Sequence, residues 1–187
     1  MKLINTIFAH GHGPYLRTCE LAIATGNRLY ASDPPKVVVP LVYGNKQINI
    51  LKEQFAEELN EDRKRILLDE TAGQIIYEAF FKGGNYFDHL AYIAANHSDL
   101  EGRLQQHFSG NIELKTLDGK KVLSNPSDII ITLSRDALLH TGLKTVNSTC
   151  GPLSEIINNV LKSNSEEFRE LDLTVLEGIK KIALGLE

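Results

Sequence analysis

The chain has 187 residues, of which 42% are hydrophobic and 24% charged, and its net charge is −4 at pH 7. This length and composition are those of one globular domain that can bury a core. The slight acidic excess and the lack of a basic patch argue against nucleic acid as a partner, and no apolar run approaches the roughly 18 residues of a membrane span.

Cysteine usage and the N-terminus bear on location and on metal binding. The two cysteines, Cys19 and Cys150, are far apart and lack the CxxC spacing of a zinc site. Reduced thiols and the lack of a signal peptide lead us to expect a cytoplasmic protein that is not transmembrane. We expect neither a metal nor a cofactor, because the sequence contains no cluster of ligating residues and no complete cofactor motif.

The first part of the chain alternates between strand-like and helix-like patterns. Residues 3–9 (LINTIFA) predict a strand. Residues 14–25 predict a helix, since Pro14 suits a first helical position and apolar residues recur at helical spacing, and Gly26 is expected to end this helix. A nearly continuous apolar run over 36–42 predicts a second strand that is covered on both faces.

The rest of the chain continues this alternation and inserts one hairpin. The Asp118-Gly119 pair lies between two strand-like runs and predicts a type I′ turn within a hairpin over 111–124. Thr71 is a candidate cap for a helix over 71–81. The remaining predicted elements are helices over 46–62, 85–108 (interrupted at 96–99), 151–162 and 166–184, and strands over 66–69, 128–134 and 143–147.

The sum of these patterns predicts an α/β fold. Strands that alternate with helices form a mainly parallel sheet, so we expect a Rossmann-like three-layer domain with at least five parallel strands, helices on both faces and one inserted β-hairpin. No linker, internal repeat or low-complexity segment divides the chain, and we therefore assign residues 1–187 to a single domain.

The stretch FAHGHGPYLRTCELA, residues 8–22, places two histidines and two glycines between the first strand and the first helix. In a parallel sheet this loop leaves the carboxyl end of the strand, where ligands bind and the following helix presents free N–H groups. Gly11 and Gly13 would let a ligand approach closely. The stretch lacks the Lys-Ser or Lys-Thr of a Walker loop and the third glycine of a dinucleotide fingerprint. His10 and His12, two residues apart, do not suit a shared metal.

Residues 11–22, G-H-G-P-Y-L-R-T-C-E-L-A, resemble the first loop and helix of glycosyltransferases with the two-Rossmann-domain (GT-B) fold. In that superfamily a G-H or G-x-G-H loop precedes a helix ending in an L-A-like pair. Residues 147–155, NSTCGPLSE, resemble a later strand-to-helix loop of the acceptor-binding domain. Alignment on Gly11-His12 keeps the histidine and brings the helix one residue early, whereas alignment on the helix puts Pro14 where that family has its histidine.

The resemblance implies the acceptor-binding half of a glycosyltransferase, which moves a sugar from a nucleotide-sugar to a hydroxyl acceptor. In such enzymes a C-terminal domain binds most of the nucleotide-sugar. We therefore expect this chain to bind a small-molecule acceptor and to transfer sugar only with a missing domain or a partner chain. Such a domain leaves an apolar surface through which two copies could form a homodimer. The alternative is a stand-alone Rossmann-type module that binds a small molecule or nucleotide, or interacts with another protein.

The candidate catalytic residues each have a functional and a structural interpretation. His12 is the candidate general base, which would take a proton from the acceptor hydroxyl; the alternative is a turn histidine bonded to backbone. Asp69 follows a strand at the same predicted edge and is the carboxylate that would orient His12. Cys150 has no neighbour in the sequence that would activate it as a nucleophile.

The candidate substrate-binding residues lie in the same two loops. They are His10, Gly11, Gly13, Thr149 and Gly151. The amides of a helix that starts at Gly151 could hold a phosphate or carboxylate, and an ordinary capped helix explains the pattern equally well. The other four histidines lie in polar stretches, where we expect them to be solvated. They are His89, His97, His107 and His140.

Overall fold

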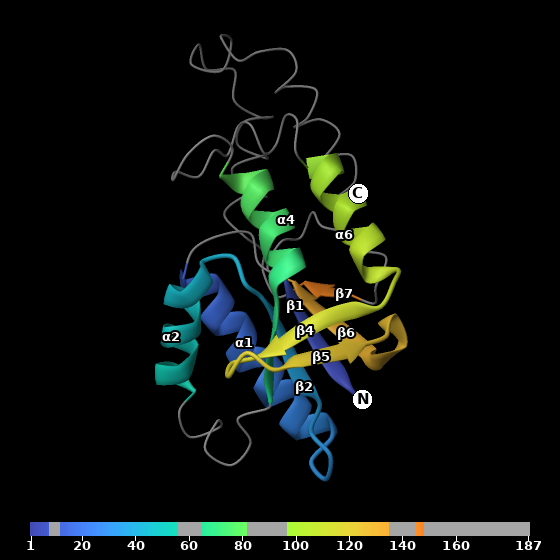
Figure 1. Cartoon of the computed structure of the whole chain (residues 1–187). Helices are drawn as coiled ribbons and strands as arrows, with labels where there is room; N and C mark the ends of the chain where they lie inside the picture. Colours follow the sequence, from blue (N-terminus) through green and yellow to red (C-terminus); the bar gives the residue numbers. More distant parts are fainter. Residues whose placement is uncertain (8–11, 56–64, 82–96, 135–144, 148–187) are drawn as a thin grey trace, which may run out of the picture.

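The computed structural model describes residues 1–7, 12–55, 65–81, 97–134 and 145–147. Its helices and strands alternate along much of the chain, as Figure 1 shows. In chain order the elements are β1 (Leu3–Ile7), α1 (His12–Leu29), β2 (Lys36–Pro40), α2 (Gly44–Gln54), β3 (Ile66–Asp69), α4 (Glu70–Phe80), α6 (His97–Phe108), β4 (Ile112–Thr116), β5 (Lys121–Ser124), the 3-10 helix η2 (Pro126–Asp128), β6 (Ile129–Ser134) and β7 (Thr145–Asn147).

The strands form one seven-stranded sheet in the order β5-β4-β3-β2-β1-β6-β7. β3, β2, β1, β6 and β7 run parallel, and β4 and β5 add an antiparallel hairpin beside β3. From β1 the chain builds β2 and β3 on one side and later places β6 and β7 on the other. The fold is therefore α/β and Rossmann-like, as predicted, and its topological switch point lies between β1 and β6.

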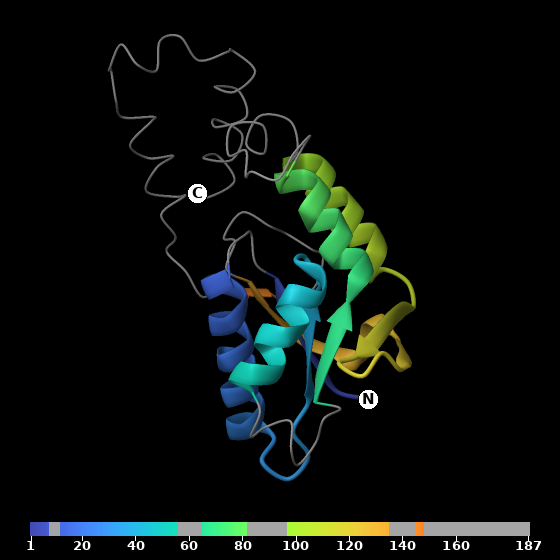
Figure 2. The same cartoon turned by 60° about the vertical axis from the view of Figure 1, so that its left-hand side comes forward.

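Helices lie beside the sheet and beyond its carboxyl edge. Figure 2 shows α1 and α2 together on one side of the strands, whereas α4 and α6 pack against each other beyond the carboxyl end of β3. α1 begins after β1 and α4 directly follows β3, so the amino ends of both helices lie at the edge where the parallel strands end. This arrangement places two helix N-termini beside the carboxyl ends of the strands.

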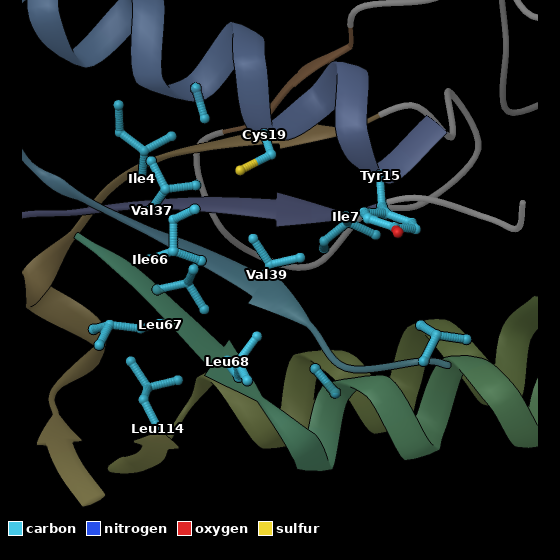
Figure 3. Packing of buried hydrophobic residues seen from close by; sticks show 14 of the residues in the cluster. Ile4, Ile7, Tyr15, Cys19, Val37, Val39, Ile66, Leu67, Leu68 and Leu114 are labelled. Atoms are coloured by element: carbon cyan, nitrogen blue, oxygen red, sulfur yellow. The ribbon is translucent and has the colours of Figure 1, made fainter. Parts of the chain in front are cut away.

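The core is most apolar at β2 and β3, where three valines and three larger aliphatic side chains are almost completely buried. Figure 3 shows Cys19 and Tyr15 projecting from α1 toward these strands, and Leu114 of the hairpin on the far side. Burial of each such aliphatic side chain contributes about 1.5–3 kcal/mol relative to exposure. A strand that is covered on both faces needs this continuous apolar run, which explains why the sequence pattern identified β2.

α1 is longer than predicted at both ends. It begins at His12 rather than Pro14, and it continues through Gly26 to Leu29. A Cβ atom on Gly26 would lie 3.1 Å from Cγ of Pro35. Gly26 therefore serves close packing of the helix against the segment that precedes β2, and the prediction that it ends the helix was wrong.

The predicted hairpin is present, but its turn is not type I′. Gly119 has a positive φ of 83°, whereas Asp118 does not, because no described residue other than glycine has a positive φ. The Gly119 N–H donates to the carbonyl of Thr116 and the Thr116 N–H to that of Lys120, each at 2.9 Å. These bonds indicate a three-residue loop, a type I turn whose last residue is left-handed.

Candidate functional site

The carboxyl ends of the parallel strands form the edge at which a ligand is expected to bind. The last residues of these strands are Ile7, Pro40, Asp69, Ser134 and Asn147. Because β1, β6 and β7 are parallel, the loops after β1 and β7 leave the sheet at the same edge. In open parallel sheets, ligands bind outside these ends beside the switch point. The edge next to β1 and β6 is therefore the candidate functional site.

The first turn of α1 lies at this edge, as the sequence predicted. Residues 8–11 connect β1 to the helix, which begins at His12 and has no acidic residue in its first turn. Free backbone N–H groups at such a helix start favour an anionic or polar group. Gly13 is exposed, and a Cβ atom on it would meet no atom within 4 Å. Packing within the described chain therefore does not require a glycine there.

Asp69 lies at the same edge, but its described partners are not those that the sequence predicted. One carboxylate oxygen accepts a hydrogen bond of 2.8 Å from the Ala72 N–H and so caps α4, which places the cap at Asp69 rather than Thr71. The other oxygen lies 2.8 Å from Nε2 of His107. Both carboxylate oxygens are engaged, and the orientation of His12 by Asp69 stays a prediction.

His107 was expected to be solvated, and that prediction was wrong. Only 11% of its side chain is exposed, and it pairs with the buried carboxylate of Asp69 across 38 residues of sequence. The pair links the start of α4 to the end of α6. A pattern along the sequence could not identify this pair, because only the packing of α6 against α4 brings the two side chains together.

Gln47 organises the loop between β2 and α2, and sequence reasoning did not single it out. Its side chain is fully buried, and its amide oxygen accepts hydrogen bonds from the N–H groups of Val42 (2.9 Å) and Tyr43 (3.0 Å). The amide nitrogen donates to the carbonyl of Pro40 at 2.8 Å. One side chain thus satisfies three backbone groups, and this holds Tyr43 at the carboxyl edge.

A row of aromatic rings also follows this edge from α1 to α4. Tyr15 and Tyr43 have ring centroids 6.3 Å apart, Tyr43 and Phe81 6.2 Å, and Phe81 and Tyr77 4.9 Å. Tyr15 is fully buried, whereas the other three rings are half-buried. Burial, helped by Tyr43 and Cys19, raises the pKa of Tyr15 to about 12. Its phenol is therefore neutral at physiological pH.

Several predicted site residues fall outside the described part of the chain. These are His10, Gly11, Thr149, Cys150 and Gly151, together with His89 and His140 and the side chains of His12 and His97. Their predicted roles stay predictions. Within the described ranges, no group of three or more His, Cys, Asp or Glu residues is placed to hold a metal ion. None of the described helices is long and apolar enough to cross a membrane.

Comparison of the chain with protein-family models, with curated proteins and with solved structures found no match.

Proposed function

We propose that this chain is the acceptor-binding half of a glycosyltransferase, with the acceptor bound at the carboxyl edge beside β1 and β6. The observation that carries the proposal is the position of the motif over residues 11–22. Its described part forms the first half of α1, which opens at the switch point of a parallel sheet. Ligand sites in such sheets occur at this position, and the motif resembles one that contacts an acceptor.

In this proposal the residues at the edge have separate roles. The imidazole of His12 takes the proton of the acceptor hydroxyl as the sugar is transferred, and Gly13 leaves space beside it. The contacts of Asp69 with Ala72 and His107 favour a structural role, so no carboxylate partner is assigned to His12. A donor-binding domain, fused or supplied by a partner chain, binds the nucleotide-sugar.

The half-buried rings of the aromatic row support a ring-shaped acceptor. Tyr43, Tyr77 and Phe81 belong to the loop after β2 and to the end of α4, which both lie toward the carboxyl edge. Aromatic side chains bury large area at little cost in conformational entropy and are common in small-molecule sites. Together they would give a saccharide ring an apolar surface to lie on.

Binding measurements on the full chain test the proposal. Titration with methyl glucoside, N-acetylglucosamine and UDP-N-acetylglucosamine should show binding of a neutral saccharide and little binding of the nucleotide-sugar. His12→Ala should weaken saccharide binding about tenfold, with stability within about 0.5 kcal/mol of the original chain. Glu20→Gln on the exposed face of α1 is the matched control and should leave binding unchanged.

Other outcomes would redirect the proposal. Binding of nucleotides without saccharides would favour the stand-alone Rossmann-type module. Saccharide binding that His12→Ala leaves unchanged would place the acceptor elsewhere on the edge, and the role of His12 as general base would fail. Joining a donor-binding domain to the chain should restore sugar transfer, and His12→Ala should abolish it.

A further inference from the structure

Two buried polar side chains at neighbouring positions of β1 and β6 have no hydrogen-bond partner in the described part of the chain. They are Asn5, through its amide nitrogen, and Thr132, through its hydroxyl. Asn5 is 1% exposed and Thr132 is 0% exposed. Their Cα atoms are register partners in the parallel β1–β6 ladder, so the two side chains leave the same face of the sheet.

The surrounding positions show that this polarity is local to the switch point. Val38 is the register partner of Asn5 on β2, and Leu67 continues the row on β3. In the other direction, Thr145 of β7 is the register partner of Thr132. The row is therefore apolar on the side of β2 and β3, and it carries an amide and a hydroxyl side chain at β1 and β6.

The stability of the sheet does not explain why Asn5 and Thr132 are polar. Strands that are covered on both faces are usually continuous apolar runs, and asparagine is depleted in strands. The neighbouring Thr6 shows the contrast, because its hydroxyl donates to the carbonyl of Val38 at 2.7 Å. Residues that break a local rule without a compensating contact mark functional positions more often than other residues do.

The hydrogen-bonding groups of Asn5 and Thr132 are suited to bind an uncharged hydroxyl oxygen. The amide nitrogen of Asn5 can only donate, and the hydroxyl of Thr132 can donate or accept, so one hydroxyl oxygen would satisfy both. Neither residue carries a charge that could offset the buried charge of a phosphate or carboxylate. Two residues beyond the pair the strands end at Ile7 and Ser134, about 7 Å further along the sheet at the usual rise per residue.

We propose that Asn5 and Thr132 form a subsite at the switch point that holds a hydroxyl oxygen of an uncharged, hydroxyl-bearing ligand. The subsite deepens the proposed function and rests on it only for the assignment of this ligand as a saccharide acceptor. The oxygen of an enclosed water has the same chemistry and is the other source that the experiment distinguishes.

The test removes one hydroxyl without changing the shape of the core. Thr132→Val deletes the hydroxyl at nearly constant volume, and Thr132→Ser keeps it as the matched control. In the full chain, melting temperature and binding of methyl glucoside, N-acetylglucosamine and inorganic phosphate are measured for each variant. Thr132→Val should melt no lower than the original chain and bind the saccharides about fivefold more weakly. Thr132→Ser should bind them within about twofold.

Asn5→Leu provides a second variant. It should also weaken saccharide binding, and its effect should not add fully to that of Thr132→Val, because the two side chains share one oxygen. Fully additive effects would show that the two side chains do not bind the same oxygen atom.

The remaining outcomes separate the subsite from its alternatives and from the proposed function. A higher melting temperature of Thr132→Val with unchanged saccharide binding would mean that the hydroxyl is buried without a hydrogen-bond partner and does not contact a ligand. A lower melting temperature with unchanged binding would assign the oxygen to an enclosed water. Tighter binding of inorganic phosphate than of the saccharides would show that the subsite does not select an uncharged ligand. No saccharide binding by the original chain would overturn the assignment of the ligand as a saccharide, and with it the proposed function. If Thr132→Val weakens binding and His12→Ala does not, the subsite stands and the proposed role of His12 fails.

Discussion

The two halves of the parallel sheet are built from different chemistry. β2 and β3 are apolar along almost their whole length, with Asp69 as their one buried charged residue, whereas β1 and β6 combine apolar residues with buried polar ones. The buried polar residues of β1 and β6 are Asn5, Thr6, Thr132 and Ser134. The apolar half stabilises the domain. The other half has buried polar residues in place of apolar ones beside the switch point, where a ligand is expected to bind.

The largest effect is expected where α4 meets the loop after β2, in the apolar half. A Cβ atom on Gly73 would lie 2.2 Å from the carbonyl oxygen of Leu41, and only a backbone shift could relieve this overlap. Gly73→Ala should therefore lower the free energy of unfolding by more than about 3 kcal/mol, measured by urea denaturation.

Gly102 of α6 provides the matched control for this change. It is exposed, and a Cβ atom on it would meet no atom within 4 Å. Gly102→Ala should raise the free energy of unfolding by up to about 1 kcal/mol, because alanine favours the helix. Similar destabilisation by both substitutions would contradict the close approach of α4 to Leu41.

The second-largest effect on stability is expected at the buried carboxylate of Asp69. Asp69→Ala removes the cap of α4 and the partner of His107, and it should cost about 2–3 kcal/mol in the free energy of unfolding. Asp69→Asn keeps an oxygen that can accept from the Ala72 N–H, so it should cost less. Thermal and urea denaturation of both variants check that Asp69→Ala is the more destabilising. A loss below about 0.5 kcal/mol for Asp69→Ala would contradict the stabilising role of this carboxylate.

Placing a hydroxyl in the apolar half tests the comparison between the halves directly. Val37 is fully buried, and its register partners are Ile4 and Ile66. Val37→Thr keeps the volume but buries a hydroxyl among apolar neighbours, which should cost about 1–3 kcal/mol by urea denaturation. The reverse change in the polar half, Thr132→Val, should cost nothing. If Thr132→Val raised the free energy of unfolding by as much as Val37→Thr lowers it, a buried hydroxyl would cost the same in both halves, and the comparison would fail.

The smallest effect is expected on the exposed surface between α4 and α6. Hydrogen bonds from Gln74 and from Arg103, the latter at 2.6 Å, hold the pKa of Glu78 below its ordinary value of 4.5. Because the folded-state pKa is lowered, this stabilisation is complete above pH 4.5 and is lost as the pH falls through the lower folded value.

Glu78→Gln should reduce the free energy of unfolding by less than about 1 kcal/mol at pH 7. The difference from the original chain should shrink toward zero in acid. A difference that persists unchanged to low pH would show that the charge of Glu78 is not its source.

Much of the architecture follows from patterns within the sequence. The apolar runs and helical periods predicted the alternation of strands and helices and the parallel sheet, and the bounds of β3 agree with the prediction. The Asp118-Gly119 pair predicted the hairpin, although the φ of Asp118 excluded the expected turn. These features depend on neighbours along the chain, where side-chain periodicity and glycine carry the information.

The details of the candidate site depend on contacts between distant parts of the chain. The sequence placed the start of α1 and Asp69 at the carboxyl edge, because the order of elements alone determines which loops leave that edge. It could not identify His107 as the partner of Asp69, since helix packing joins two side chains 38 residues apart. Nor could it pair Asn5 with Thr132, because strand register is fixed only when the sheet assembles and its buried faces are matched.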